Sequence, residues 1–313
     1  MNETALKFLF LLVLAALLYS GRELRLESAK TDAQAQIYSH MPQPPPLEKS
    51  LTEEQVSGGY EIESVPSASV SAGEPVTTPI SPAPIFLMAT LNKDQYIFSK
   101  NNTNRWPMAS ITKLMTAVIA RELISPSESI EVSISAQASE GIAGGFTAGE
   151  LFIRDDLIKA LILVSSNDAA VALAEKSGME NFVLAMNTKA KTLGMNETFF
   201  IEPTGLSALN QASAEDLRIL ARYIYDEHPD IFSYSRLREI TITESKTGRK
   251  RLLFNINEFA GRADFIGGKT GFTEEAGGNL LSIFSINSEP IIIVILNSKD
   301  RFGDTLRLLA QYN

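Results

Sequence analysis

The sequence predicts an α/β fold of the α+β type, in which one sheet is assembled from both ends of a domain and a helical lobe is inserted between them. Three observations support this prediction. Strand-like apolar segments occur at residues 85–100 and again after residue 239, and the segments between them carry apolar residues at helical spacing. In addition, 44% of the 313 residues are hydrophobic and 21% are charged, so the chain can bury one substantial core.

The N-terminal half of the predicted domain contains strands and then helices. Residues 85–100 read as two apolar strands around a turn at residues 92–94. Residues 110–124 have apolar side chains at helical spacing, and the pattern stops before a Ser-Pro pair. Residues 154–178 read as two helices interrupted at residues 165–167. This interruption is a place where polar side chains could project into a cleft.

Two further helices and a run of strands complete the domain. Residues 179–194 predict a helix closed by Gly194, and residues 213–227 begin with a capping-box pattern from Ser213 to Asp216. A final helix is predicted at residues 303–312. The strand-like segments between them are residues 239–243, 251–256, the region of Lys269, 279–286 and 290–297.

The first 83 residues differ from the rest of the chain. The uncharged run from Phe8 to Gly21 has 14 residues, which is short of the ~20 of a membrane span and within the ~7–15 of a signal-peptide apolar region. Residues 1–21 are therefore predicted to be a signal peptide or an uncleaved signal anchor. Residues 22–83 are rich in Pro, Ser, Ala and Glu and lack periodicity, which predicts a disordered linker. The folded domain is expected at residues 84–313, outside the cytoplasm.

Composition excludes several functions. A net charge of -9 without long basic runs argues against nucleic acid as a partner. The absence of cysteine excludes thiol catalysis, cysteine-zinc sites and disulfides. His40 and His228 are far apart and lack metal-ligand spacing, so no metal or cofactor is expected. A serine or threonine nucleophile would therefore need a base other than histidine.

Ser110 and Lys113 are a candidate nucleophile and base. They lie three residues apart near the start of a predicted helix, hence on one face. A lysine that is desolvated beside a serine can lose its proton and act as the base. The alternative is a surface lysine one turn from a helix-start serine, but the chain has no other Ser-x-x-Lys.

Two other short patterns occur more than once. Ser-x-Asn begins at Ser99, Ser165 and Ser285, and only Ser165 with Asn167 lies at a break between helices, where a helix cap is the alternative. Lys-Thr-Gly occurs at residues 246–248 and 269–271. The first copy, between two strand-like runs, reads as an exposed hairpin turn. The second is predicted to be the anion-binding edge of a site.

The order Ser110-x-x-Lys113, Ser165-x-Asn167, Lys269-Thr270-Gly271 is the order in penicillin-recognising serine acyltransferases and class A β-lactamases. The chain from residue 84 resembles the D-alanyl-D-alanine carboxypeptidase family of low-molecular-mass penicillin-binding proteins. The resemblance implies a β-lactamase/transpeptidase-like fold, with an antiparallel sheet of about five strands and helices on both faces. The similar blocks are residues 101–117, 149–175, 186–207 and 267–281.

The resemblance also implies a role for each residue. Ser110 would form an acyl-enzyme, Lys113 would take its proton, and Ser165 would relay a proton to the leaving amine. Asn167 would orient the substrate or Lys113. The remaining implied substrate-binding residues are Lys269, Thr270 and Thr273 for a terminal carboxylate, Phe272 with Ser110 for oxyanion amides, Gly271 for an open strand edge, and Arg301, for which a solvated turn arginine is the alternative.

The implied function is a serine-type D-Ala-D-Ala carboxypeptidase that acts on peptidoglycan stem peptides in cell-wall maturation or remodelling. β-Lactams would be covalent inhibitors, and contact with a membrane is expected only through the N-terminal segment. Several alternatives stay open: an endopeptidase or transpeptidase of cross-links, a non-catalytic receptor for β-lactams or muropeptides, and a class A β-lactamase. The last would use Glu202, but residues 203–206 lack its companion Asn. Asn279 also departs from the usual small or thiol residue.

Overall fold

The computed structural model describes residues 81–93, 95–141 and 144–312. The predicted signal segment at residues 1–21 and nearly all of the linker predicted at residues 22–83 lie outside these residues. No helix within the described ranges is both long and apolar enough to cross a membrane. The boundaries proposed for the first two segments therefore stay predictions.

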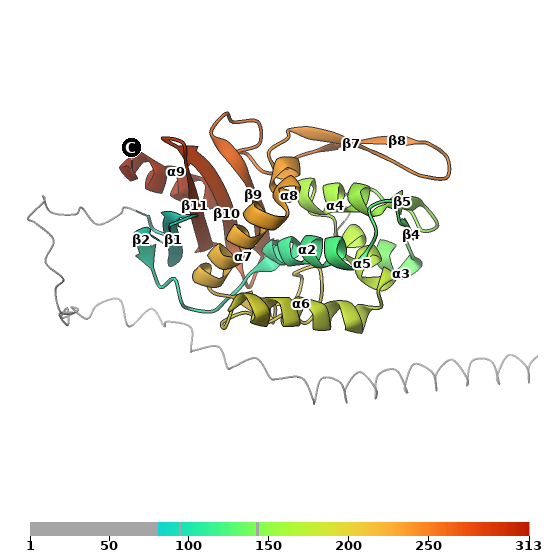
Figure 1. The fold of residues 1–313 in the computed structure, drawn as a ribbon, viewed down its shortest axis with the longest axis horizontal. Helices are drawn as coiled ribbons and strands as arrows, with labels where there is room; N and C mark the ends of the chain where they lie inside the picture. The colour runs from blue at the N-terminus through green and yellow to red at the C-terminus, as the bar shows by residue number, and fades with distance from the viewer. Residues whose placement is uncertain (1–80, 94, 142–143, 313) are drawn as a thin grey trace, which may run out of the picture. The chain divides into compact units, whose positions relative to one another are not determined.

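A five-stranded sheet forms one side of the domain, and its strands come from both ends of the chain (Figure 1). All of its neighbouring strands are antiparallel, in the order β2-β1-β11-β10-β9. The prediction of a sheet assembled from both ends is confirmed. The strands are β1 (Ile85–Thr90), β2 (Tyr96–Lys100), β9 (Phe265–Thr273), β10 (Gly277–Ile286) and β11 (Glu289–Ser298).

The two faces of the sheet support two separate cores because side chains alternate along a strand. In the β1–β11 register, Leu87 lies opposite Val294 and both belong to the larger cluster, whereas the next pair, Met88 and Ile293, belongs to the smaller one. Helix α9 (Arg301–Tyr312) supplies two leucines to the smaller cluster. The other helices contribute to the larger cluster, so helices cover both faces as expected.

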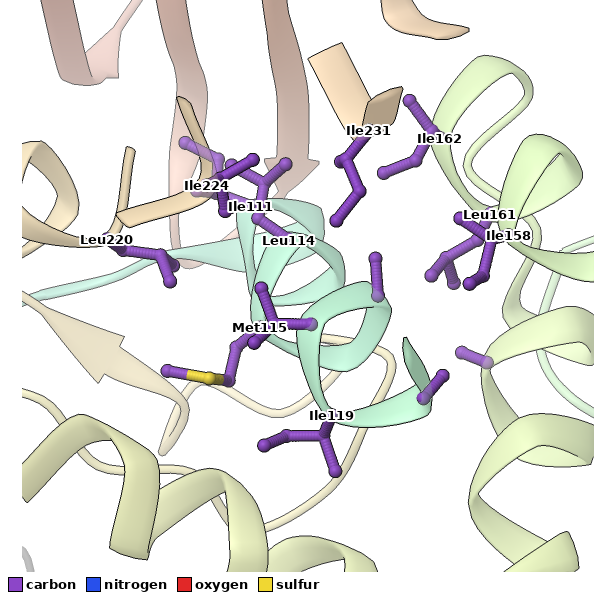
Figure 2. Packing of buried hydrophobic residues seen from close by; sticks show 14 of the residues in the cluster. Ile111, Leu114, Met115, Ile119, Ile158, Leu161, Ile162, Leu220, Ile224 and Ile231 are labelled. Atoms are coloured by element: carbon purple, nitrogen blue, oxygen red, sulfur yellow. The ribbon is translucent and has the colours of Figure 1, made fainter. Parts of the chain in front are cut away.

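Helix α2 (Lys113–Leu123) lies in the centre of the larger core and continues a 3-10 turn, η2 (Ala109–Thr112). Figure 2 shows its apolar side chains among those of α4 (Arg154–Leu163), α7 (Ala214–Glu227) and α8 (Pro229–Ser235). Each fully buried Leu or Ile contributes about 1.5–3 kcal/mol. The start of α2, where Ser110 and Lys113 lie, is therefore held by packing on several sides.

The helices of the inserted lobe begin and end close to the residues that the sequence predicts. Helices α4 and α5 (Asn167–Lys176) meet at the expected break, and α6 (Met179–Leu193) ends at Gly194 in a left-handed conformation. Ser213 accepts a hydrogen bond from Asp216 N, but the Asp216 carboxylate accepts from Glu197 N and Thr198 Oγ1. The capping box is therefore only half formed, because Asp216 holds the preceding loop.

Two strand-like segments do not join the main sheet. Strands β7 (Glu239–Thr243) and β8 (Lys250–Phe254) pair with each other as a separate antiparallel hairpin that projects from the domain (Figure 1). Lys246 is exposed in its turn, as predicted. Two short strand pairs and a short helix complete the described fold: β3 (Trp106–Pro107) with β6 (Gln211–Ala212), β4 (Ser129–Glu131) with β5 (Leu151–Ile153), and α3 (Ile134–Gln137).

Candidate active site

Ser110 and Lys113 are in contact at the start of α2. Lys113 Nζ donates to Ser110 Oγ at 2.9 Å, and the Lys113 side chain is fully buried. Burial lowers the pKa of Lys113 to about 7, although the charge of Glu202 opposes the shift. The neutral amine that forms near this pH can accept the Ser110 proton. The alternative of a surface lysine is therefore wrong.

The loop at residues 202–205 contacts the same end of α2, at Lys113 and Thr116. Lys113 Nζ also donates to Thr204 O at 2.5 Å, and Thr116 Oγ1 donates to Pro203 O at 2.6 Å. Gly205 has a φ of 82°, and a Cβ there would overlap the Ala109 carbonyl. Only glycine permits both the conformation and the close approach. The loop is thus a second support for the Lys113 amine.

Glu202 organises that loop from within. Its carboxylate accepts hydrogen bonds from Thr204 N at 2.5 Å, Gly205 N at 2.7 Å and Asn210 Nδ2 at 2.9 Å. These bonds place the Thr204 carbonyl against Lys113. Glu202 therefore has a structural task, which argues against the β-lactamase alternative, where it would activate the deacylating water.

The Ser165–Asn167 segment occupies the break between α4 and α5. The cap of α5 is Ser166, whose Oγ accepts from Ala169 N at 3.2 Å, so Ser165 is not used as a helix cap. Ser165 has a φ of 59°. Asn167 Nδ2 donates to Glu140 O at 2.5 Å, and its buried Oδ1 has no hydrogen-bond partner among the described residues.

The lysine of the second Lys-Thr-Gly copy forms a hydrogen bond with Ser165. Lys269, on β9, is buried, and its Nζ donates to Ser165 Oγ and to Thr270 O, each at 2.9 Å. Burial holds the pKa of Lys269 well below its usual range, and the nearby charges of Lys113 and Arg301 lower it further. A bound anion would reverse part of this shift by stabilising the charged amine.

Gly271 and Arg301 fix β9 beside the nucleophile turn. A Cβ at Gly271 would lie 2.9 Å from Met108 O and 3.1 Å from Ser110 N, tighter than atoms normally approach. Arg301 is half-buried, and its Nη1 donates to Gly271 O at 2.7 Å. Burial lowers the pKa of Arg301, opposed by Glu258. Arg301 is thus not the solvated turn residue of the alternative interpretation.

The other predicted residues on β9 have different surroundings. Thr270 is buried, whereas Phe272 is 64% exposed. Thr273 Oγ1 accepts from Ala276 N at 3.1 Å and so holds the following turn. Asn279, which departs from the usual residue, is fully buried: it donates to Pro107 O at 2.8 Å and accepts from Asn297 N at 2.9 Å. It therefore ties β10 and β11 to the segment before the nucleophile turn.

The structure thus brings the three patterns to one place. Sequence reasoning missed the Thr204 carbonyl, the role of Glu202 in holding it, and the cap at Ser166. Residues 186–207 resemble a block of the family, but no local pattern in them indicates the contact with Lys113. Across the described ranges, no group of three or more His, Asp or Glu side chains could hold a metal ion.

The comparison with protein families identifies the chain. A model of the D-alanyl-D-alanine carboxypeptidase family matches residues 76–300. The chain belongs to the D-alanyl-D-alanine carboxypeptidase family. Its similarity to D-alanyl-D-alanine endopeptidase of Escherichia coli is 34% identity over 231 residues, covering 71% of this chain and 74% of that relative. It is also 34% identical over 190 residues to D-alanyl-D-alanine carboxypeptidase DacF of Bacillus subtilis, covering 58% and 48%.

Solved structures confirm the fold of this carboxypeptidase-family chain. The D-alanyl-D-alanine carboxypeptidase of Mycobacterium tuberculosis superposes with a TM-score of 0.70 at 24% identity, covering 78% of this chain and 96% of that one. Penicillin-binding protein D2 of Listeria monocytogenes, in its ampicillin-bound form, has a TM-score of 0.64 at 25% identity, covering 74% and 98%. The predictions of family, fold and enzyme class, a serine-type hydrolase, are confirmed.

Proposed function

We propose that this enzyme removes the terminal D-alanine from peptidoglycan stem peptides that end in D-Ala-D-Ala, through an acyl-enzyme at Ser110. The pairing of two serines with two lysines carries the proposal: Lys113 Nζ lies 2.9 Å from Ser110 Oγ, and Lys269 Nζ lies 2.9 Å from Ser165 Oγ. The charge of Lys113 acts on Lys269, so the nucleophile and its lysine base lie in the same site as the Ser165 hydroxyl and a second buried lysine. The catalytic domain would comprise residues 84–313.

Acylation would begin with proton transfer. Neutral Lys113 takes the Ser110 proton as Ser110 Oγ attacks the carbonyl of the penultimate D-alanine. The Thr204 carbonyl, 2.5 Å from Nζ, keeps the amine aimed at Ser110 and stabilises the ammonium that forms. The backbone amides of Ser110 and Phe272 would hold the oxyanion, because Gly271 lets β9 approach the nucleophile turn.

The leaving D-alanine would depart as an amine that needs a proton. Ser165 is suited to supply it, since its hydroxyl contacts Lys269 Nζ, and the ammonium form of Lys269 that a bound substrate carboxylate stabilises can reprotonate Ser165. The terminal carboxylate of the substrate would be held by Lys269 and by the Thr270 and Thr273 hydroxyls, with Arg301 adding positive charge. Asn167, the first residue of α5, would orient the substrate. A water then hydrolyses the ester at Ser110.

A second candidate activity is cleavage of D-alanyl cross-links. It is favoured by the relatives named D-alanyl-D-alanine endopeptidase in Escherichia coli and Pseudomonas aeruginosa, at 34% and 32% identity over 74% of each. The same Ser110 chemistry would serve, but the leaving amine would belong to a neighbouring stem peptide. Preference for free termini or cross-links then depends on how the site accepts groups beyond the scissile bond.

β-Lactams would acylate Ser110 because their strained amide resembles the scissile bond. The ampicillin-bound Listeria relative supports this. Intact-mass measurement of the protein after ampicillin treatment should show one added inhibitor mass, absent in Ser110→Ala. The expected location is the outer face of the cytoplasmic membrane, with residues 1–21 as signal or anchor and residues 22–83 as the tether.

Digestion of purified peptidoglycan by the full chain tests the proposal. Mass spectrometry of the products should show stem peptides shortened by one D-alanine, with no such change for Ser110→Ala. Loss of cross-linked dimers without free D-alanine would assign the endopeptidase activity instead. D-Alanine release that survives in Ser110→Ala would remove the mechanism altogether.

A further inference from the structure

A hollow of about 610 Å³ opens on the surface at the C-terminal end of α8. It lies between residues 233–238 and the turn at residues 261–263, which leads into β9. Its lining includes Tyr234, Arg236, Arg238 and Arg262. None of these residues takes part in the chemistry described above.

The hollow concentrates positive charge on a protein of net charge -9. Arg262 is paired with Asp264, with Nε–Oδ1 at 3.0 Å and Nη2–Oδ2 at 2.7 Å. Arg236 and Arg238 are exposed, and among the described residues neither guanidinium forms an ion pair or hydrogen bond. Two uncompensated guanidinium groups thus border one concavity.

The segment that carries these arginines is held firmly. Asn255 Nδ2 donates to Ser235 O and Leu237 O at 2.8 Å, and Asn255 N donates to Arg238 O at 2.8 Å. Gly261 N donates to Arg236 O at 2.8 Å. A Cβ at Gly261 would overlap the Arg238 side chain, so glycine there makes room for it. The two arginines therefore project from a fixed backbone, which lowers the entropic cost of binding a ligand.

We propose that this hollow binds the carboxylates of a second, non-reacting stem peptide of the peptidoglycan polymer. The inference rests on the proposed function, because it takes that polymer as substrate. A guanidinium fork matches a carboxylate in bidentate geometry, so two unpaired forks suit a ligand with two carboxylates. The concave shape suits a discrete group rather than a flat bilayer.

The position of the hollow fits a polymeric substrate. Ala263 borders it, and Lys269 lies six residues further on, with β9 beginning at Phe265. At ~3.3 Å per residue for an extended chain, the two backbone positions are at most about 20 Å apart. One polymer carrying several stem peptides could thus occupy the hollow and the active site together. Binding at two places raises the local concentration of reactive termini without changing the chemistry.

The test uses Arg236→Gln with Arg238→Gln, and Lys246→Gln with Lys250→Gln as the matched control. Both doubles remove two exposed positive charges, but only the first pair borders the hollow. In a Ser110→Ala background, full-length protein is cosedimented with purified peptidoglycan. The arginine double should lose affinity about tenfold or more, because charge-assisted hydrogen bonds are lost. The lysine double should stay within about twofold, because exposed charges contribute little.

Activity on a soluble pentapeptide is measured with Ser110 intact. The arginine double should release D-alanine at the wild-type rate, which also reports correct folding, and single Arg236→Gln should bind peptidoglycan with intermediate affinity. If wild type releases no D-alanine yet the arginine double still loses peptidoglycan binding, the proposed function fails and the polymer site stands. Equal binding by both doubles overturns the polymer site alone.

Titration calorimetry identifies the ligand. A disaccharide tripeptide without D-Ala-D-Ala should bind wild type and the lysine double but not the arginine double. Inorganic phosphate that binds at the arginines when the tripeptide does not would overturn the assignment to stem-peptide carboxylates. So would arginine-dependent binding to phosphatidylglycerol vesicles without arginine-dependent binding to peptidoglycan.

Discussion

The two Lys-Thr-Gly tripeptides have the same residues and opposite surroundings. Lys246 is exposed in the β7–β8 turn, where Glu244 accepts hydrogen bonds from Thr247 Oγ1 and Thr247 N, and Gly248 has a φ of 72°. Lys269 is buried on β9 and contacts Ser165. The first tripeptide forms hydrogen bonds within its own turn, whereas the second places its lysine in the candidate active site. Identity of sequence therefore does not make a site; burial and the facing residue do.

The largest effect is expected where a buried lysine acts directly on the nucleophile. Lys113→Met removes the base, so kcat/KM for a D-Ala-D-Ala pentapeptide should fall by about 10³-fold or more. The melting temperature should not fall, because the change also removes a desolvated amine. Steady-state D-alanine release measures kcat/KM, and a thermal melt gives the melting temperature. Activity within tenfold of wild type would show that another group takes the Ser110 proton.

Paired alanine variants test whether the two Lys-Thr-Gly tripeptides differ in function. Lys269→Ala should lower kcat/KM by about 10²-fold, because it removes both the charge expected to hold the substrate carboxylate and the Ser165 partner. Lys246→Ala should leave it within about twofold, as an exposed turn lysine contributes little. The same pentapeptide assay serves both. Comparable losses in the two variants would contradict the assignment of one turn and one site.

The pH dependence should follow Lys113. Because the neutral amine is the active form and its pKa is about 7, acylation should rise about tenfold from pH 6 to pH 8. Stopped-flow acylation by a chromogenic β-lactam measures this. A rate that stays flat across this range would place the pKa of the base elsewhere.

Stability should change with pH in the same direction. The folded protein holds Lys113 with a pKa of about 7, whereas 10.5 is the ordinary value, so the unfolded chain binds more protons between these values. The free energy of unfolding therefore rises with pH across this window and gains nothing below it. Urea denaturation at pH 7 and pH 9 should show the increase, and Lys113→Met should reduce it.

The smallest effects are expected at the glycines. Gly271→Ala should cost about 1–3 kcal/mol and slow acylation, because the added Cβ meets Met108 O and Ser110 N. Gly248→Ala meets no atom within 4 Å but keeps a positive φ, so it should cost about 1 kcal/mol and leave activity intact. Urea denaturation and the pentapeptide assay separate the two. Loss of activity in Gly248→Ala would link the hairpin to the site.

Much of the fold follows from local patterns. Strand-like apolar segments predicted β1, β10 and β11, and helical spacing with end signals predicted α2 and the break between α4 and α5. These patterns depend on neighbours within a few residues, so the sequence contains them directly. The separate β7–β8 hairpin was not distinguished from the main sheet, because strand periodicity does not say which partner a strand pairs with.

The sequence by itself determined which residues could do the chemistry: a serine with a lysine one turn away, a serine at a helix break, and a lysine before a threonine and glycine. Only the tertiary structure decided how they work together. It buries Lys113 so that its pKa falls, sets the Thr204 carbonyl against it through Glu202, gives the helix cap to Ser166, and joins Arg301 to Gly271. Burial and contacts between distant segments arise from packing, and no local pattern of residues records them.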